Sequence, residues 1–209
     1  MATANVIVDI SHHNAIASMN DVKSAGILAI IHKSTEGTVF VDPEFDARRK
    51  AARQAGFLWG SYHFVSPVAP EKQVDFFLKH TDPKDDELIA IDYEPSSAGL
   101  PNMTLAQLVE TVGLVKKKTG RTPVVYGGHL LREALGAKPN NDLAECPLWY
   151  ARYADKPVGV PNTWQAPTMW QYTDGKSGND PKTVSGISGL VDRSVFFGTA
   201  DELRQRWPL

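Results

Sequence analysis

The chain has 209 residues, of which 42% are apolar and 22% charged, and its 22 basic and 24 acidic side chains give a formal net charge of −2. This composition excludes general disorder and fibrous classes, and the small net charge provides no global field that would draw the chain onto nucleic acid or an anionic membrane. A chain of this length buries one sizeable core, so we expect a single domain over residues 1–209.

Neither a cofactor nor a metal ion is expected. The single cysteine, Cys146, has no partner for a disulfide, and His12, His13 and His63 lack the spacing of a metal-binding motif. No apolar run approaches the roughly eighteen residues that span a bilayer, so membrane insertion is not expected. The N-terminus shows no basic segment followed by a hydrophobic one, which leaves the route of export open.

Strand-like and helix-like segments alternate over the first two thirds of the chain. Short β-branched or aromatic runs predict strands at residues 5–11, 27–33, 57–64, 88–94 and 122–128. Segments with helical spacing lie between them, most clearly at residues 43–55, 70–80 and 104–119. The last of these has Thr104 as its N-cap and ends at Gly120, whereas Pro43 suits the first turn of the first.

The pattern changes after Gly136. Three further strands are predicted at residues 147–153, 168–173 and 190–196, joined by Pro-, Gly- and Asn-rich connections without a helical period. Eight strands and about five helices in alternation predict an α/β fold. We expect parallel strands with right-handed crossovers that close into a single TIM-like barrel, whose last three strands lack full helices.

Acidic residues gather at the ends of the predicted strands. Asp9 lies at the end of the first run, Asp92 and Glu94 finish the fourth run in "LIAIDYEP", and the eighth run carries Asp192. Chemistry in a parallel barrel lies at the carboxyl ends of the strands. We therefore expect these four carboxyl groups to meet on one rim.

Alternation along the fourth run predicts the direction of two of these acids. With a period of two residues, Asp92 and Glu94 share a face with Ala90, whereas Ile91 and Tyr93 share the opposite, apolar face. The apolar face should meet the helices, so the acids point into the barrel mouth with Cβ atoms about 6.5–7 Å apart.

Carboxyl groups crowded in this way suit one reaction in particular. Like charges in a cleft raise the pKa of at least one carboxyl group, which then holds a proton near neutral pH while its neighbours ionise. Cleavage of a glycosidic bond requires an acid for the leaving oxygen and a carboxylate beside the developing oxocarbenium ion. The sequence therefore predicts a glycosidase.

Eight motifs extend this prediction over nearly the whole chain: "DISHHN", "KSTEG", "DPEF", "GSYHF", "IDYEP", "WYARY", "MWQY" and "GLVDRSVF". In order and interval they resemble glycoside hydrolase family 25, the Chalaropsis-type lysozymes (N-acetylmuramidases) that include phage endolysins. The resemblance implies a flattened (β/α)5(β)3 barrel that cleaves the β-1,4 bond between N-acetylmuramic acid and N-acetylglucosamine. Two departures are Asn14, where many members carry Gln, and Arg193-Ser194, where Asp192 is often followed by x-Asn.

The resemblance also implies roles for individual residues. Glu94 resembles the proton donor of the family, and Asp92 resembles its partner, which orients or stabilises the 2-acetamido group of the substrate. Asp9 and Asp192 resemble the two further acids of the site. Aromatic residues resemble those that line the sugar cleft, namely Tyr62, Tyr126, Trp149, Tyr153 and Trp170. The implied partner is the glycan strand of peptidoglycan, bound by a monomer that acts on the cell wall, outside the cell or in the periplasm.

Two other functions and the stereochemistry stay open from sequence. "AIDYEP" resembles the end of the family 18 chitinase signature, but Glu87 and Ala90 stand where that signature expects Asp. A barrel that binds the cell wall without turnover would also keep the cleft. The predicted Cβ spacing lies at the lower edge of the inverting range of about 6.5–9.5 Å, whereas the acetamido group of muramic acid favours a substrate-assisted route.

Overall fold

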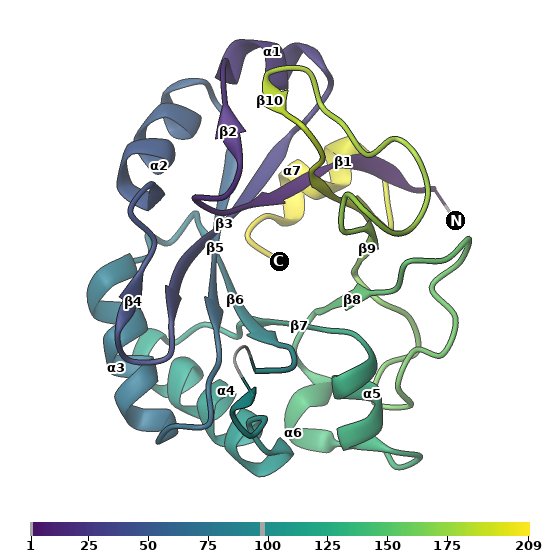
Figure 1. Cartoon of the computed structure of the whole chain (residues 1–209). Helices are drawn as coiled ribbons and strands as arrows, with labels where there is room; N and C mark the ends of the chain where they lie inside the picture. Colours follow the sequence, from purple (N-terminus) through teal and green to yellow (C-terminus); the bar gives the residue numbers. More distant parts are fainter. Residues whose placement is uncertain (1, 97–98) are drawn as a thin grey trace.

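A closed eight-stranded barrel forms the body of the computed structural model, which describes residues 2–96 and 99–209 (Figure 1). Its strands are β1 (Ala4–Ile10), β3 (Ala29–Glu36), β5 (Leu58–Phe64), β6 (Leu88–Tyr93), β7 (Val124–Gly127), β8 (Leu148–Ala151), β9 (Met169–Thr173) and β11 (Asp192–Phe196). They pair in the order β1-β11-β9-β8-β7-β6-β5-β3, and β1 also pairs with β3, which closes the sheet. The predicted α/β barrel is confirmed.

Helices follow the first five barrel strands and are absent between the last three. They are α1 (Met19–Ser24), α2 (Phe45–Gln54), α3 (Pro70–Thr81), α4 (Leu105–Thr119) and α5 (His129–Leu135), with the short α6 (Asn141–Ala144) before β8. α4 begins at the predicted Thr104, which forms a capping box with Gln107, and ends at Gly120, whose φ of 71° suits glycine. In the described part of the chain, no helix combines the length and apolar character needed to cross a membrane.

Three short strands lie outside the barrel and were not predicted. β4 (Phe40–Val41) pairs with the end of β3, and β2 (Ala15–Ile16) pairs with β10 (Ile187–Ser188). The β2–β10 pair joins the segment after β1 to the long connection between β9 and β11. Segments from the two ends of the chain therefore meet beside the mouth of the barrel (Figure 1).

The direction of the last barrel strand differs from the prediction. β11 is antiparallel to both of its neighbours, β1 and β9, so the prediction of an all-parallel barrel was wrong. A parallel neighbour requires a crossover to the other end of the sheet, whereas an antiparallel one can be joined on the same side. Residues 174–191 form such a same-side connection. As a result β11 starts at the rim where β9 ends, and Asp192 lies directly opposite Asp9 on β1.

Alternation along the strands separates the barrel interior from the helix layer. Inward side chains form one apolar cluster, which includes Ile7, Ala29, Ile31, Leu88, Ala90, Val124, Met169 and Phe196. Ile89, Ile91 and Tyr93 belong instead to the cluster formed with α3 and α4. The predicted two faces of β6 are therefore confirmed.

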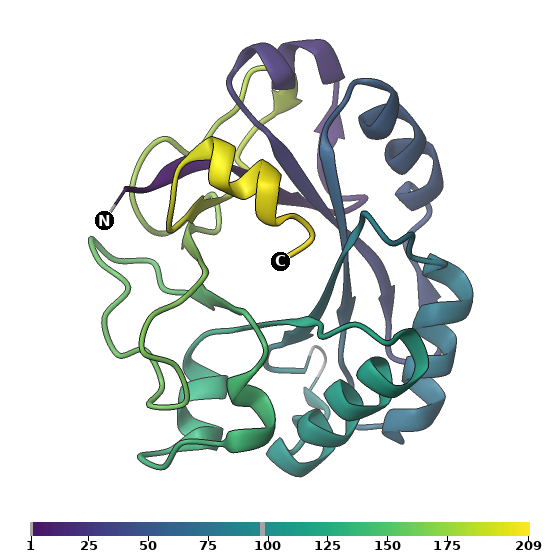
Figure 2. The same ribbon diagram turned by 180° about the vertical axis from the view of Figure 1, so that it is seen from behind.

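A C-terminal helix that the sequence analysis missed covers the other end of the barrel. α7 (Ala200–Arg206) begins with a capping box between Thr199 and Glu202. Leu203 is fully buried in the interior cluster, where Trp207 packs beside it. Figure 2 shows α7 lying across the barrel opening. Because this end is covered, the rim that carries Asp9 and Asp192 is the end left for a ligand.

A buried ion-pair network fixes the start of β6 near α7. Glu87 is only 1% exposed, and its carboxylate accepts hydrogen bonds from Arg49, from Arg53 and from the backbone N–H of Lys84. Asp86, beside it in sequence, binds the same Arg53 with a carboxylate that is 67% exposed. Two neighbouring acids therefore share a partner but differ in their exposure to water.

We predict that Glu87→Gln lowers the free energy of unfolding by about 3 kcal/mol, because it removes the buried carboxylate that pairs with Arg49 and leaves that arginine charge uncompensated. The control Asp86→Asn should cost about 1 kcal/mol or less, since exposed pairs contribute little. Urea unfolding followed by circular dichroism measures both. Equal losses in the two variants would contradict a structural role that depends on burial.

Candidate active site

Four carboxyl groups meet at the open end of the barrel. Asp9 and Asp92 lie near the ends of β1 and β6, Glu94 follows β6 directly, and Asp192 is the first residue of β11. All four border one small cavity, which is also lined by Tyr62, Tyr126 and Trp149. Asp192 reaches this rim because β11 is antiparallel, so the start of the strand lies among the ends of its neighbours.

Asp9 and Asp192 share a hydrogen bond across the β1–β11 pair. Burial raises the pKa of Asp9 well above its ordinary value of 3.8, and the negative charge of Asp192 raises it further. Burial also raises the pKa of Asp192, to about 7. The hydrogen bond between the two groups raises the pKa of Asp9 and lowers that of Asp192, so it opposes the effect of burial only at Asp192.

Asp92 and Glu94 form the second pair. Asp92 is 5% exposed, and burial followed by the charge of Glu94 raises its pKa well above the ordinary value, against the opposing effect of Lys33. Burial raises the pKa of Glu94, whereas a hydrogen bond from Tyr126 lowers it. From the sequence, like charges alone were expected to raise these pKa values. Burial is the larger cause in all four groups.

Gln171 on β9 connects these acids to two tyrosines. Its Nε2 donates to both carboxylate oxygens of Asp9, at 2.9 and 3.0 Å, and its Oε1 accepts from the hydroxyls of Tyr126 and Tyr153, at 2.7 and 2.9 Å. The Tyr126 hydroxyl also lies 3.4 Å from Oε1 of Glu94. A phenol carries one proton, so Tyr126 donates to Gln171 or to Glu94 but not to both at once.

Gln171 was not predicted as a site residue, whereas its neighbour Trp170 was. Alternation along β9 contained the signal, because Met169 faces the barrel interior and Gln171, two residues on, shares that face. Trp170 points to the other face, where its Nε1 donates to the backbone oxygen of Arg152 at 2.7 Å. Among the described residues, those lining the two cavities at the mouth do not include Trp170.

The other predicted aromatic residues occupy different depths. Tyr62, Tyr126 and Trp149 border the small cavity among the acids. Trp149 is 2% exposed and donates from Nε1 to Oγ of Ser194, at 2.9 Å, so it belongs to the barrel interior. Tyr153 is 36% exposed and stands at the entrance, where a sugar ring can reach its face.

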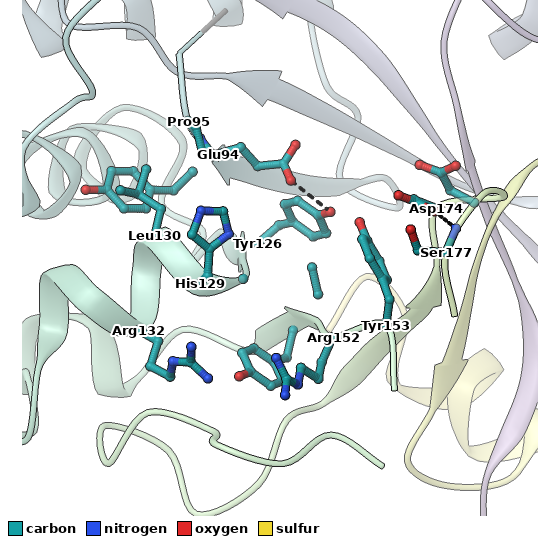
Figure 3. A pocket seen from close by; sticks show the side chains of 15 residues that line it. Glu94, Pro95, Tyr126, His129, Leu130, Arg132, Arg152, Tyr153, Asp174 and Ser177 are labelled. Atoms are coloured by element: carbon teal, nitrogen blue, oxygen red, sulfur yellow. Dashed lines mark hydrogen bonds between the residues drawn. The ribbon is translucent and has the colours of Figure 1, made fainter. Parts of the chain in front are cut away.

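A larger cavity of about 610 Å³ adjoins the acid cluster (Figure 3). This volume falls within the range of about 300–1,000 Å³ that is typical of ligand sites. Glu94, Tyr126 and Asp192 line both cavities. Much of the remaining wall was not predicted from sequence: His129, Arg132, Arg152, Asp174 and Ser177. Four of these five follow β7, β8 or β9 directly or within a few residues.

Two of the three histidines considered for a metal site, His63 and His12, form hydrogen bonds within the protein. His63 is fully buried between Oγ1 of Thr35, at 2.7 Å, and Oε1 of Gln73, at 3.1 Å, and burial lowers its pKa to about 4. His12 pairs with Asp42 at 3.0 Å. Over residues 2–96 and 99–209, the structure contains no group of three or more His, Cys, Asp or Glu side chains suited to a metal ion.

A barrel with paired carboxyl groups in a cleft at its mouth is an arrangement that glycosidases use. The sequence model of the glycosyl hydrolases family 25 matches residues 8–180. The chain therefore belongs to glycoside hydrolase family 25, the Chalaropsis-type lysozyme family that its motifs resemble, and its class is that of a glycosidase.

Individual relatives agree with this membership. Lysozyme M1 of Streptomyces globisporus is 30% identical over 208 residues, covering 94% of this chain and 69% of that protein. The protein YegX of Escherichia coli O157:H7 is 33% identical over 175 residues, covering 82% of this chain and 60% of that protein. The crystal structure of a bacterial lysozyme from Streptomyces coelicolor superposes with a TM-score of 0.83 at 28% identity, covering 96% and 95% of the two chains. The chain thus spans between 60% and 69% of the length of the first two relatives.

The raised pKa of Asp192 predicts how stability changes with pH. In the unfolded chain this carboxyl group ionises near 3.8, whereas in the folded chain it ionises near 7. Its contribution to folding is therefore fully present below pH 3.8 and is lost as the pH rises through about 7. We predict that Asp192→Asn reduces this loss by at least about 1 kcal/mol, the equivalent of one pKa unit.

Urea unfolding at several pH values between these limits measures the effect. The control is Asp155→Asn, which changes an acid that is exposed to water in the folded chain and should keep the wild-type pH profile. An Asp192→Asn profile that runs parallel to the wild type would contradict the desolvation of this carboxyl group.

Proposed function

We propose that this protein is a peptidoglycan hydrolase that cleaves the β-1,4 bond between N-acetylmuramic acid and N-acetylglucosamine, with Glu94 as the general acid. Membership of family 25 and the similarity to Lysozyme M1 support the class of substrate. The observation that carries the assignment is that Glu94 lines both cavities and has a pKa raised by burial. It is therefore accessible to a glycan and able to hold a proton.

The proposed reaction is assisted by the substrate. The carbonyl oxygen of the 2-acetamido group attacks C1 of the muramic acid residue, the bond from C1 to the leaving oxygen breaks, and Glu94 gives its proton to that oxygen. A water molecule then attacks C1 of the resulting oxazolinium ion, the bond from C1 to the acetamido oxygen breaks and restores the acetamido group, and the water gives a proton back to Glu94. Cleavage with retained configuration follows, since C1 is inverted twice.

Asp92 orients the acetamido group in this proposal. Its Oδ1 is buried and has no hydrogen-bond partner among the described residues, and its pKa is raised in part by Glu94. Because the charge of Glu94 disfavours a charge on Asp92, this buried pair holds one proton more readily than it carries two charges. An acetamido N–H that donates to Asp92 would stabilise its carboxylate form and leave the proton on Glu94.

Asp9 and Asp192 act in this scheme as positioning residues. Asp9 accepts two hydrogen bonds from Gln171, which in turn accepts from Tyr126, the tyrosine beside Glu94. When Tyr126 donates to Gln171, hydrogen bonds connect Asp9 to the Tyr126 hydroxyl, whose oxygen lies 3.4 Å from Oε1 of the proposed acid. The site of action that follows from the substrate is the bacterial cell wall.

We predict that Glu94→Gln lowers the release of reducing ends from purified peptidoglycan by about 100-fold or more, because general acid catalysis contributes at least that factor. Glu133→Gln, an exposed position on α5, makes the same charge change and should retain activity. Mass spectrometry of the wild-type products should find muramic acid at the new reducing end.

Other outcomes separate the alternative functions. Glucosamine at the new reducing end would show that the enzyme is a glucosaminidase and would contradict muramidase action. If the wild type and Glu94→Gln both bind the cell wall and neither releases sugar, hydrolysis is contradicted. The protein would then be a barrel that binds the cell wall without turnover. Full activity in Glu94→Gln would overturn the assignment of the acid.

A further inference from the structure

Two arginine side chains line the large cavity on the side away from Glu94 (Figure 3). Arg132 lies on α5, and Arg152 follows β8 directly. The ion pairs found among residues 2–96 and 99–209 involve neither of them. The cavity therefore has an acidic side, with Glu94 and Asp192, and a basic side whose two arginines form no ion pair with a carboxylate of the described residues.

Arg152 is held in place by its backbone while its side chain lacks a partner. Its N–H donates to the backbone oxygen of Gln171 at 3.1 Å, and its own oxygen accepts from Nε1 of Trp170 at 2.7 Å. In contrast, the side-chain Nε is buried and has no hydrogen-bond partner among the described residues. Leaving a buried charged donor unpaired is costly, so an acceptor supplied by a ligand would relieve that cost.

The turn at Gly159 lies against the guanidinium group of Arg132 and leaves room for it. Gly159 has a φ of 75°, and a Cβ atom there would lie 3.1 Å from Nη1 of Arg132. The Tyr150 hydroxyl donates to the backbone oxygen of Gly159 at 2.9 Å, which holds this turn against the cavity wall. A glycine in a conformation that favours glycine thus lets the backbone pass close to the arginine.

We infer that Arg132 and Arg152 form a carboxylate-binding subsite of the same cleft. The inference rests on the proposed function, because it assigns a partner to a group on the proposed substrate. Muramic acid carries a lactyl ether at O3, so the carboxylate is either that of the lactyl group itself or one on a peptide attached to it. Guanidinium groups match carboxylates in shape and charge, and a buried donor strengthens the interaction.

One cavity joins both sides, so a single ligand can reach both. A neutral sugar ring beside Glu94 and an anionic substituent beside Arg152 would match the charges of the side chains that line the cavity. The opposite orientation would bring the carboxylate toward Glu94, Asp174 and Asp192, where like charges repel. The two arginines would therefore select the orientation of the glycan as well as its substituent.

The test compares substrates that differ only in charge. Soluble glycan fragments are prepared with free carboxyl groups and with the same groups as methyl esters, and kcat/KM is measured for each. We expect the ratio of the two values, free acid over ester, to fall about tenfold in Arg132→Gln/Arg152→Gln, mainly through KM, because a charged hydrogen bond contributes at least that factor. Each single substitution should give a smaller fall in this ratio than the double substitution.

The matched control is Lys138→Gln/Lys156→Gln. It removes the same charge from exposed positions that are close to the two arginines in sequence, and it should keep the wild-type ratio. An unchanged ratio in the arginine variant would overturn the inference while leaving the proposed function intact. Fragments without peptide and fragments with peptide identify the source of the carboxylate. If the acid-to-ester ratio falls only for fragments without peptide, the carboxylate is that of the lactyl group. If the ratio falls for fragments with peptide, the carboxylate is on the peptide.

A binding measurement separates this inference from hydrolysis. In the Glu94→Gln background, calorimetry with the free-acid fragment should give a Kd about tenfold weaker when both arginines are replaced, and little change for the ester. Absence of hydrolysis by the wild type would contradict the proposed function, and the calorimetric comparison would still decide the subsite. Equal affinities for the acid before and after replacement would overturn it.

Discussion

Removal of water from four carboxyl groups is the constraint on which this site depends. Burial raises the pKa of Asp9, Asp92, Glu94 and Asp192, and in each case it is a larger cause than neighbouring charge. The barrel provides the burial, because α7 covers one end and apolar side chains fill the interior below the acids. Partly protonated carboxyl groups are therefore a consequence of where the strands end, and an acid able to protonate a leaving oxygen follows from the same cause.

The antiparallel direction of β11 and the helix-free connections before it complete the cleft. β11 runs antiparallel, so its first residue, Asp192, faces Asp9 across one strand pair. No helix lies between β8 and β11, and the connections in this stretch line the large cavity with Arg152, Tyr153 and Asp174. Figure 3 shows these side chains around the opening beside Glu94. The helix-free connections from β8 to β11 thus supply much of the cavity wall that a glycan would touch.

Alternation and capping explain how much of this was predictable from sequence. The two faces of β6 and the ends of α4 depend on local rules, and both agree with the structure. The direction of β11 depends on which side of the sheet a long connection follows, which no local pattern specifies. α7 carried a readable capping box that was overlooked, and Gln171 carried the alternation signal of β9. The partners of Gln171 are 18 to 162 residues away in sequence, so its hydrogen bonds required the fold.

Direct titration of the four carboxyl groups is the sharpest test of this account. Carbon-13 labelling of Asp and Glu side chains, with assignment by single Asn and Gln substitutions, allows the pKa of each group to be followed by NMR. The account predicts that Asp9, Asp92 and Glu94 titrate above their ordinary ranges and that Asp192 titrates near pH 7. Four groups that all titrate near 4, as carboxyl groups in water do, would contradict it.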